Sequence, residues 1–253
     1  MRRWATLLPV AALLLPGLTA CSADDPAQAG PPRPQDAEKG EKVDVEAFLD
    51  ELEGSFDDGA TAHVTFAVSG QVKLHGRGSV EYGDDGMDVD LRLADWQPGG
   101  GTVDLRTVGD ATYMRVPESR GLWVAIGADD LGLTDSVLQD ADPRAQLDGA
   151  RDEITEVRYS GEDTLAGATV RRYQVVAKVA ASAAPGASGP AVTDYWFDTD
   201  GRVVRRSVDL GASGSASFTW ADWDTPVDIV APPETRTITV RELEKLRRRQ
   251  SAG

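Results

Sequence analysis

Residues 61–93 read TAHVTFAVSGQVKLHGRGSVEYGDDGMDVDLRL, and this stretch decides the fold of the chain. Apolar side chains such as Val64 and Phe66 recur at every second position with polar residues between them, which is the period of a β-strand with one buried face. Turn residues at 69–70 and 83–86 divide the stretch into three strands. The stretch therefore predicts an antiparallel meander with one apolar face.

The strand period continues well beyond this stretch. Further strands are expected at 103–105, 113–116, 123–126, 153–159, 168–179, 192–197, 202–210 and 215–220. Residues 43–56 place apolar side chains at helical spacing and acids on the opposite face, which predicts an amphipathic helix. Residues 128–150 lose the strand period, so one or two short helices are expected there. The chain is therefore predicted to be α+β, with about eleven strands.

The N-terminus has the layout of a removable export signal. Arg2 and Arg3 precede an apolar run at 4–15, which is shorter than the roughly 20 residues that a membrane-spanning helix needs. Leu18-Thr19-Ala20-Cys21 resembles the bacterial lipobox. The resemblance implies cleavage before Cys21, a diacylglyceryl group on that residue, and a protein tethered to the extracytoplasmic face of the cell membrane. The alternative is an ordinary signal peptide with a chance cysteine.

Composition predicts four regions along the chain. Residues 1–20 form the signal, and 21–42 hold the lipidated cysteine and a tether with four prolines and no large apolar residue, which is expected to be disordered. Residues 43–233 form one domain, and 234–253 form a basic tail that either contacts an anionic membrane surface or is solvated. Within the domain, Ala180 to Pro190 has nothing bulky to pack and is expected to be a mobile loop that interrupts the second half of the sheet. Either this loop leaves the mouth of a pocket open, or the protein does not carry lipid.

The overall charge excludes nucleic-acid binding. The chain carries 42 acidic and 26 basic residues, a formal net charge of -16, and such a surface repels a phosphate backbone. Cys21 is the only cysteine, so no intramolecular disulfide forms. A monomer is expected.

Signatures of catalysis and of metal binding are missing from the sequence. His63 and His75 are the only histidines, each on the polar side of a strand, and there is no Gly-x-Ser-x-Gly elbow and no phosphate-binding glycine loop. Asp198-Thr199-Asp200-Gly201 is typical of a tight turn, because a calcium loop would need an oxygen ligand where Trp196 stands. We therefore expect no enzyme activity, no metal and no cofactor.

Several short motifs in a fixed order resemble the actinobacterial lipoproteins of the LppX/LprG type. The motifs are VEYGDDG at 80–86, TYMRVP at 112–117 with WV at 123–124, DPRAQL at 142–147, YWFD at 195–198, WADWDTPV at 220–227 and APP at 231–233. The resemblance covers residues 43–233. It implies a LolA-like half-barrel, in which a curved antiparallel sheet wraps around helices and leaves a hydrophobic cavity. It also implies binding of lipid or lipoglycan without catalysis.

Candidate site residues follow from this fold and from the strand pattern. The side chains expected to face the cavity or its helical plug are Val64, Phe66, Val68, Leu74, Leu91, Leu93 and Leu105, with Trp196 or Phe197 on the opposite flank. The alternative is a fully packed core built from the same residues. Two adjacent arginine pairs form a possible clamp for a lipid headgroup if they gather at the mouth, and otherwise pair with acids across strands: Arg171, Arg172, Arg205 and Arg206.

Three functions remain open at this point. The first is a membrane-anchored carrier that binds acyl chains and moves or presents them across the cell envelope. The second is an interaction or sensor lipoprotein that carries no lipid and presents its acidic surface to a partner. The third, an envelope hydrolase, requires converging carboxylates or a serine with a base.

Overall fold

The computed structural model describes residues 30–70, 73–83, 86–95, 101–127, 151–178, 191–209, 211 and 214–251, and residues 31–253 form one unit of their own. The described strands are β1 (Thr61–Gly70), β2 (Leu74–Gly83), β3 (Gly86–Ala94), β4 (Thr102–Val108), β5 (Ala111–Arg115), β6 (Trp123–Ile126), β7 (Ile154–Leu165), β8 (Ala168–Ala177), β9 (Ala191–Phe197), β10 (Val203–Asp209), β11 (Gly214–Ala221) and β12 (Thr237–Thr239). The described helices are α1 (Val45–Gly54) and α4 (Val240–Ser251), with the short 3-10 turns η1 (Pro34–Asp36), η2 (Pro117–Ser119) and η5 (Glu234–Arg236).

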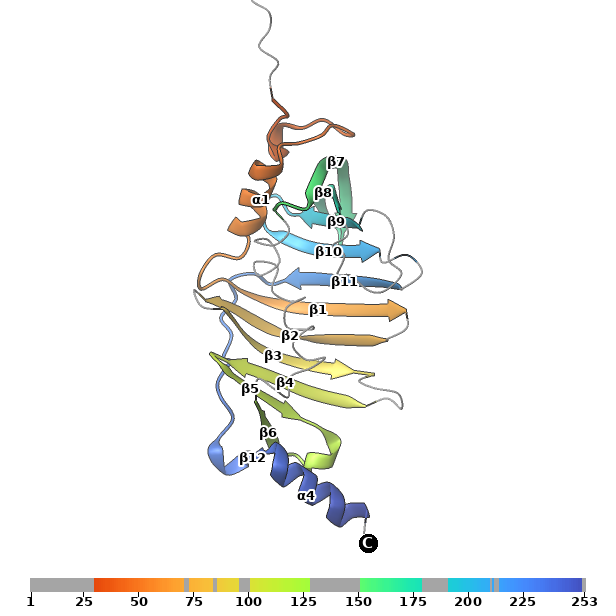
Figure 1. Ribbon diagram of the computed structural model, residues 1–253. Coiled ribbons are helices and arrows are strands. Elements are labelled where there is room, and N and C mark those ends of the chain that lie inside the picture. The colour runs from red at the N-terminus through yellow and green to blue at the C-terminus, as the bar shows by residue number, and fades with distance from the viewer. Residues whose placement is uncertain are drawn as a thin grey trace, which may run out of the picture. The chain divides into compact units, whose positions relative to one another are not determined.

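All twelve described strands belong to one curved, open sheet (Figure 1). Their order is β12-β6-β5-β4-β3-β2-β1-β11-β10-β9-β8-β7, so two meanders, β1 to β6 and β7 to β11, meet where β1 pairs with β11. The pairs are antiparallel except for β12, which adds to β6 in parallel. The register across the joint sets Phe66 opposite Phe218 and Val64 opposite Trp220. The two halves thus share one continuous apolar face.

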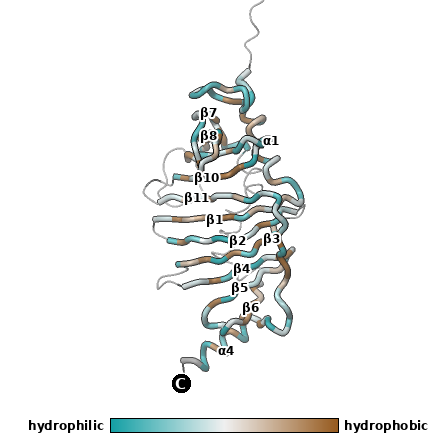
Figure 2. The backbone as a smooth tube through the Cα atoms, turned by 180° about the vertical axis from the view of Figure 1, so that it is seen from behind, coloured by the Kyte–Doolittle hydropathy of each residue, from teal (hydrophilic) through white to brown (hydrophobic). Residues whose placement is uncertain are grey.

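The sheet has two chemically distinct faces, and hydropathy alternates along its strands (Figure 2). We call the side that bears Phe66 and Phe218 the inner face, and the side that bears Thr65 and Thr219 the outer face, because neighbouring residues of a strand point to opposite sides. Gly76 lies directly across from Phe66. A Cβ atom at Gly76 would come within 2.5 Å of the Phe66 ring, so glycine makes room there for an aromatic side chain.

Helix α1 packs on the inner face. Asp44 caps its N-terminus, where Asp44 Oδ1 accepts a hydrogen bond from the Ala47 N–H at 2.8 Å. The Phe48 ring contacts Tyr173 and Phe197 with centroids 5.6 and 5.8 Å away. At the other end of the helix, the buried Ser55 hydroxyl accepts a hydrogen bond from the Val203 N–H at 3.1 Å. Aromatic packing and this hydrogen bond together fix the helix to β8, β9 and β10.

The α+β class with a curved sheet is confirmed, while details differ from the sequence prediction. Twelve strands are described where about eleven were expected. Residues 31–42, predicted as part of a disordered tether, belong to the folded unit: Pro34 is buried and the Gly40 N–H bonds to the Tyr159 carbonyl at 2.7 Å. The predicted tail also joins the unit, since β12 extends the sheet and Leu243 of α4 is buried.

Four predictions fall outside the described residues: the export signal at 1–20, the lipidation of Cys21, the helices at 128–150, and the loop at 180–190. In the part of the chain that the structure describes, no helix has the length and apolar character needed to cross a bilayer. The Asp198 turn is described, and its carboxylate accepts hydrogen bonds from the N–H groups of Asp200 and Arg202 at 3.0 and 2.9 Å. This carboxylate therefore serves to close the hairpin.

Candidate functional site

Most of the predicted cavity residues come together on the inner face. One cross-strand row runs through seven strands from β11 to β6 and consists of Trp220, Val64, Gly78, Leu91, Leu105, Met114 and Val124. A neighbouring row contains Phe218, Phe66, Gly76, Leu93 and Val103. Leu74 and Phe197 are buried in the same apolar cluster, and Val68 packs against it. These rows form an apolar wall that spans both halves of the sheet.

Trp196 lies on the outer face, away from this wall. Its Cα partners are Arg172 and Arg205, and Arg205 in turn pairs with Thr219 of the outer face. The Trp196 indole N–H donates to Asp163 at 3.2 Å, and both guanidinium groups stack over the ring at 5.1 Å. Adjacent residues of a strand cannot both point inward, so only Phe197 of this pair belongs to the wall.

The four candidate headgroup arginines divide between the two faces in the same way. Arg171 lies on the inner face and forms an ion pair with Glu51 of α1. Arg172 lies on the outer face and forms an ion pair with Asp194 at 2.9 Å. Arg205 is its outer-face neighbour over Trp196. The four side chains therefore do not gather into one clamp.

Arg206 is the one of the four that points inward without a carboxylate partner among the described residues. The register sets it between Tyr195 of β9 and Phe218 of β11 on the inner face. Its guanidinium carbon lies 6.0 Å from the centre of the Tyr195 ring. The Nε and Nη1 atoms are buried, and no described residue provides a hydrogen-bond acceptor for them. A cation held in apolar surroundings without an anion is costly, and it is the unusual feature of this face.

Tyr173 ties the segment ahead of α1 to the inner face. Its hydroxyl donates to the Pro34 carbonyl at 2.8 Å, and its ring contacts Phe48, Tyr159 and Phe197. Burial raises the pKa of the Tyr173 phenol, with the nearby Glu51 charge adding to the rise. The phenol is therefore a neutral structural donor throughout the physiological range of pH.

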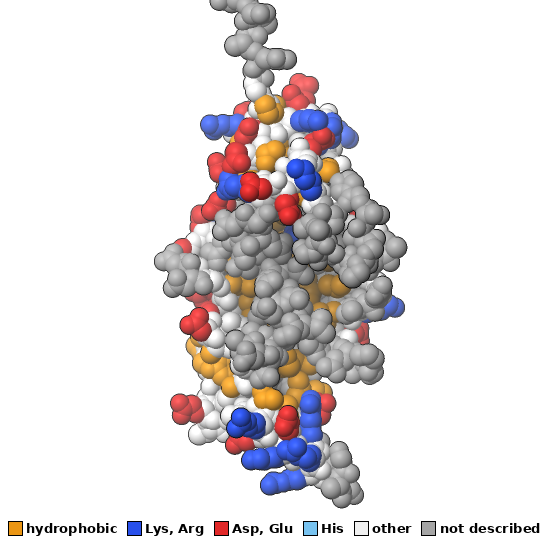
Figure 3. All heavy atoms as spheres, in the orientation of Figure 1, with side chains coloured by type: hydrophobic (Ala, Val, Ile, Leu, Met, Phe, Trp, Pro, Cys, Tyr) orange, Lys and Arg blue, Asp and Glu red, His pale blue; other side chains and the backbone are white. Residues whose placement is uncertain are grey.

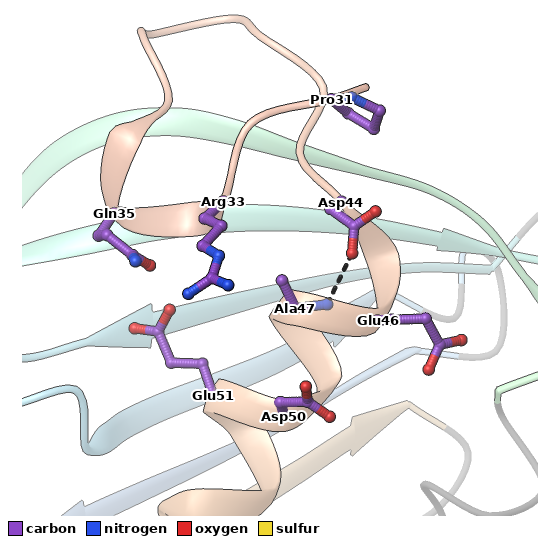
Figure 4. Close-up of a pocket in the computed structure, with 8 residues that line it drawn as sticks. All are labelled: Pro31, Arg33, Gln35, Asp44, Glu46, Ala47, Asp50 and Glu51. Carbon is purple, nitrogen blue, oxygen red and sulfur yellow. Dashed lines mark hydrogen bonds between the residues drawn. The ribbon is translucent and has the colours of Figure 1, made fainter. Parts of the chain in front are cut away.

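A pocket of about 540 Å³ lies beside the N-terminus of α1 (Figure 4). Half of its lining residues are acidic and one is an arginine: Pro31, Arg33, Gln35, Asp44, Glu46, Ala47, Asp50 and Glu51. Three of the four carboxylates already have partners, since Asp44 caps the helix, Glu51 pairs with Arg171 and Glu46 pairs with Arg151. No group of described histidine, cysteine and acidic side chains is arranged to hold a metal ion. This pocket therefore supplies no chemistry of its own.

A second pocket, of about 490 Å³, lies on the outer face across β1 to β6, and we call it the outer groove. Its lining side chains are His63, Thr65, Arg77, Ser79, Asp90, Arg92, Asp104, Arg106, Arg115 and Trp123, with Val64 and Gly78 in its floor. The four arginines of this groove were not among the site residues predicted from the sequence. Their alternation along each strand was visible, but their assembly depends on the register of the four strands β2 to β5.

Asp104 holds the outer groove together. Its carboxylate accepts hydrogen bonds from Arg92 Nε at 2.9 Å and from Arg115 Nη2 at 2.7 Å. Burial alone would raise the pKa of Asp104, but the hydrogen bonds and charges of Arg92 and Arg115 outweigh burial and hold this pKa below its ordinary value. The ionised carboxylate therefore stabilises the folded state.

Replacing Asp104 by asparagine is expected to lower the free energy of unfolding at neutral pH. The depressed pKa means that the carboxylate contributes stability above its unfolded pKa of about 4 and loses it as the pH falls through the lower folded value. The difference between wild type and Asp104→Asn should therefore shrink below pH 4, which urea unfolding at a series of pH values would measure. A difference that stays constant down to the acid limit would contradict this role.

Comparison with known proteins places the fold. No family model and no curated protein matches the sequence. Among solved structures, the lipoprotein LppX of Mycobacterium tuberculosis superposes with a TM-score of 0.51 at 21% identity, covering 74% of this chain and all 100% of LppX. The chain has an LppX-type fold.

A second solved structure agrees with the LppX-type assignment. LprF from Mycobacterium bovis superposes with a TM-score of 0.51 at 15% identity, covering 73% of this chain and 95% of LprF. The fold resemblance that the sequence motifs implied is thereby confirmed. At these identities the likeness establishes the LppX-type fold, and the function has to be argued from the inner face.

Proposed function

We propose that the protein is a membrane-anchored envelope lipoprotein that binds acyl chains against its inner face and carries or presents them across the envelope. The observation that carries this proposal is that the apolar wall covers more strands than α1 and the residues just after it contact through their aromatic rings. The described aromatic contacts of Phe48 and Phe56 reach β2, β8, β9 and β11. The wall continues beyond them through Leu91, Leu105 and Val124 on β3, β4 and β6.

The chemistry of this wall suits a long apolar ligand. Hydrophobic side chains gather on the viewed face, above the Lys and Arg side chains around α4 (Figure 3). Each acyl methylene that leaves water on such a surface contributes about 0.8 kcal/mol, so a chain laid across several strands binds firmly without any polar contact. A curved sheet that does not close into a barrel offers a concave apolar face of the kind on which apolar ligands bind.

Arg206 supplies the polar end of the proposed site. Buried guanidinium N–H groups without an acceptor bind a carboxylate or phosphate oxygen strongly, because the anion restores the lost hydrogen bonds. We therefore assign to Arg206 the headgroup role that four arginines shared in the sequence-based prediction. The membrane anchor at Cys21 remains part of the proposal, since it keeps the domain at the surface where its ligand resides.

Mass spectrometry of lipid extracted from residues 31–253, purified from a host with an actinobacterial envelope, tests the proposal. Wild type is expected to retain lipid in stoichiometric amount. Leu91→Trp should lose that lipid with little change in stability, because the larger side chain occupies the ligand's place. The matched control, Ala67→Trp, adds the same side chain on the exposed outer face and should retain the lipid.

A different outcome would favour the interaction lipoprotein. If no variant carries lipid, and Leu91→Trp lowers the free energy of unfolding by about 1–3 kcal/mol, the inner face is a filled core in which a larger side chain does not fit. The proposal of lipid binding would then be rejected.

A further inference from the structure

The outer groove has more positive charge than its own residues neutralise. It contains the four guanidinium groups of Arg77, Arg92, Arg106 and Arg115 and only two carboxylates, in a chain whose net charge is -16. Asp104 serves both Arg92 and Arg115, and Asp90 pairs with Arg106. Arg77 is exposed and makes no ion pair with any described residue. The local charge is thus opposite in sign to that of the whole protein.

The strand register places two of these positive charges against each other, which destabilises the sheet when no anion is bound. Arg77 of β2 stands directly opposite Arg92 of β3, and the row continues through Asp104 of β4 to Arg115 of β5. Like charges directly opposite one another across a strand pair destabilise a sheet. An anion placed between Arg77 and Arg92 would remove this repulsion, in the way that Asp104 removes it between Arg92 and Arg115.

Two of the four arginines, Arg106 and Arg115, are held in place before any ligand arrives. Arg106 donates to the Val230 carbonyl at 2.8 Å and stacks over Trp123 at 5.0 Å, while Arg115 stacks over the same ring at 4.8 Å. Trp123 is buried beneath them. Guanidinium groups fixed in this way lose little side-chain entropy on binding, and their fork of N–H donors matches the oxygens of a phosphate.

From this arrangement we infer that the outer groove is a binding site for a phosphate group, with Arg77 and Arg92 as its principal donors. Thr65 and Ser79 add hydroxyl groups beside them. A volume of about 490 Å³ accommodates a phosphate together with the glycerol or sugar that bears it. The site lies on the opposite side of the sheet from the apolar wall and does not depend on the proposed lipid-carrying function.

Two probes distinguish the source of the phosphate. Glycerol 3-phosphate, titrated into residues 31–253 by calorimetry, tests a soluble ligand. Flotation with phosphatidylcholine vesicles that contain or lack phosphatidic acid tests a lipid headgroup. Arg77→Glu is expected to weaken binding of the active probe by about tenfold or more, because it removes one donor and places a carboxylate against the ligand.

Lys178→Glu is the matched control, since it makes the same charge change at an exposed residue beyond the end of β8. This control should change affinity by less than about twofold at moderate salt, where distant surface charges are screened. Equal losses in both variants, or no binding of either probe, would overturn the inference. Tighter binding of succinate than of glycerol 3-phosphate would assign the groove to acidic peptides instead and would also overturn it.

Discussion

Arg206→Met is expected to make the lipid-free domain more stable and to abolish its preference for acidic lipids. Two buried guanidinium nitrogens without acceptors cost the folded protein about 1–3 kcal/mol, and methionine fills a similar space without that cost. The melting temperature of lipid-free protein should therefore rise by several degrees, as about 2–4 °C follows from each kcal/mol in a domain of this size. Differential scanning calorimetry measures this change.

The ligand side of the same prediction compares palmitate with hexadecanol, which differ only in the charged end. Wild type should bind palmitate about tenfold to a hundredfold more tightly, since a hydrogen bond to a charged group contributes about 1.5–3 kcal/mol. Arg206→Met should bind both equally. Arg205→Met is the control: it removes the adjacent arginine from the outer face and should leave the preference intact. Loss of the preference in Arg205→Met, or its survival in Arg206→Met, would refute the assignment.

Phe48→Ala is expected to lower the free energy of unfolding by about 3–5 kcal/mol, the largest loss that we predict for one side chain. Phe48 is 1% exposed and its ring lies 5.6, 5.7 and 5.8 Å from those of Tyr173, Tyr195 and Phe197. Truncation leaves a cavity between α1 and the two strands β8 and β9. It also removes support from Tyr195, the ring that lies under Arg206. Urea unfolding measures the loss.

Asp50→Ala provides the control for Phe48→Ala within the same helix. Asp50 is exposed, so its replacement should change the free energy of unfolding by less than about 0.5 kcal/mol. A loss below about 1 kcal/mol for Phe48→Ala would mean that the aromatic contacts do not hold α1 to the sheet.

The local pattern of apolar and polar residues was enough to predict the strands and the first helix. The alternation at 61–93 predicted β1, β2 and β3, and the helical spacing at 43–56 predicted α1, because a period of 2 or 3.6 is written directly into neighbouring residues. Residues 31–42 were misjudged for the complementary reason. They lack large apolar side chains and are held in part by backbone groups, such as the Gly40 N–H on the Tyr159 carbonyl. Hydropathy does not register such contacts.

For the candidate sites too, local alternation placed some residues, while others depended on how the strands pair. Val64, Phe66, Leu91 and Leu105 could be placed on one face from alternation alone, and the structure sets them side by side. The choice of Phe197 over Trp196, and of Arg206 over its neighbours, required the pairing of β9 and β10 with β11. A shift of one residue in that pairing would have exchanged every one of these side chains between the faces.

The sequence by itself determined which segments are strands, which residues share a face within each strand, and the acidic character of the chain. Only the tertiary structure decided that β1 pairs with β11, which lies about 150 residues further along the chain and has no local signal for its partner. That one pairing joins two meanders into a single apolar wall on the inner face. On the outer face, the register of β2 to β5 likewise gathers arginines from four strands into the outer groove, because cross-strand neighbours are fixed by hydrogen bonding and not by distance along the chain.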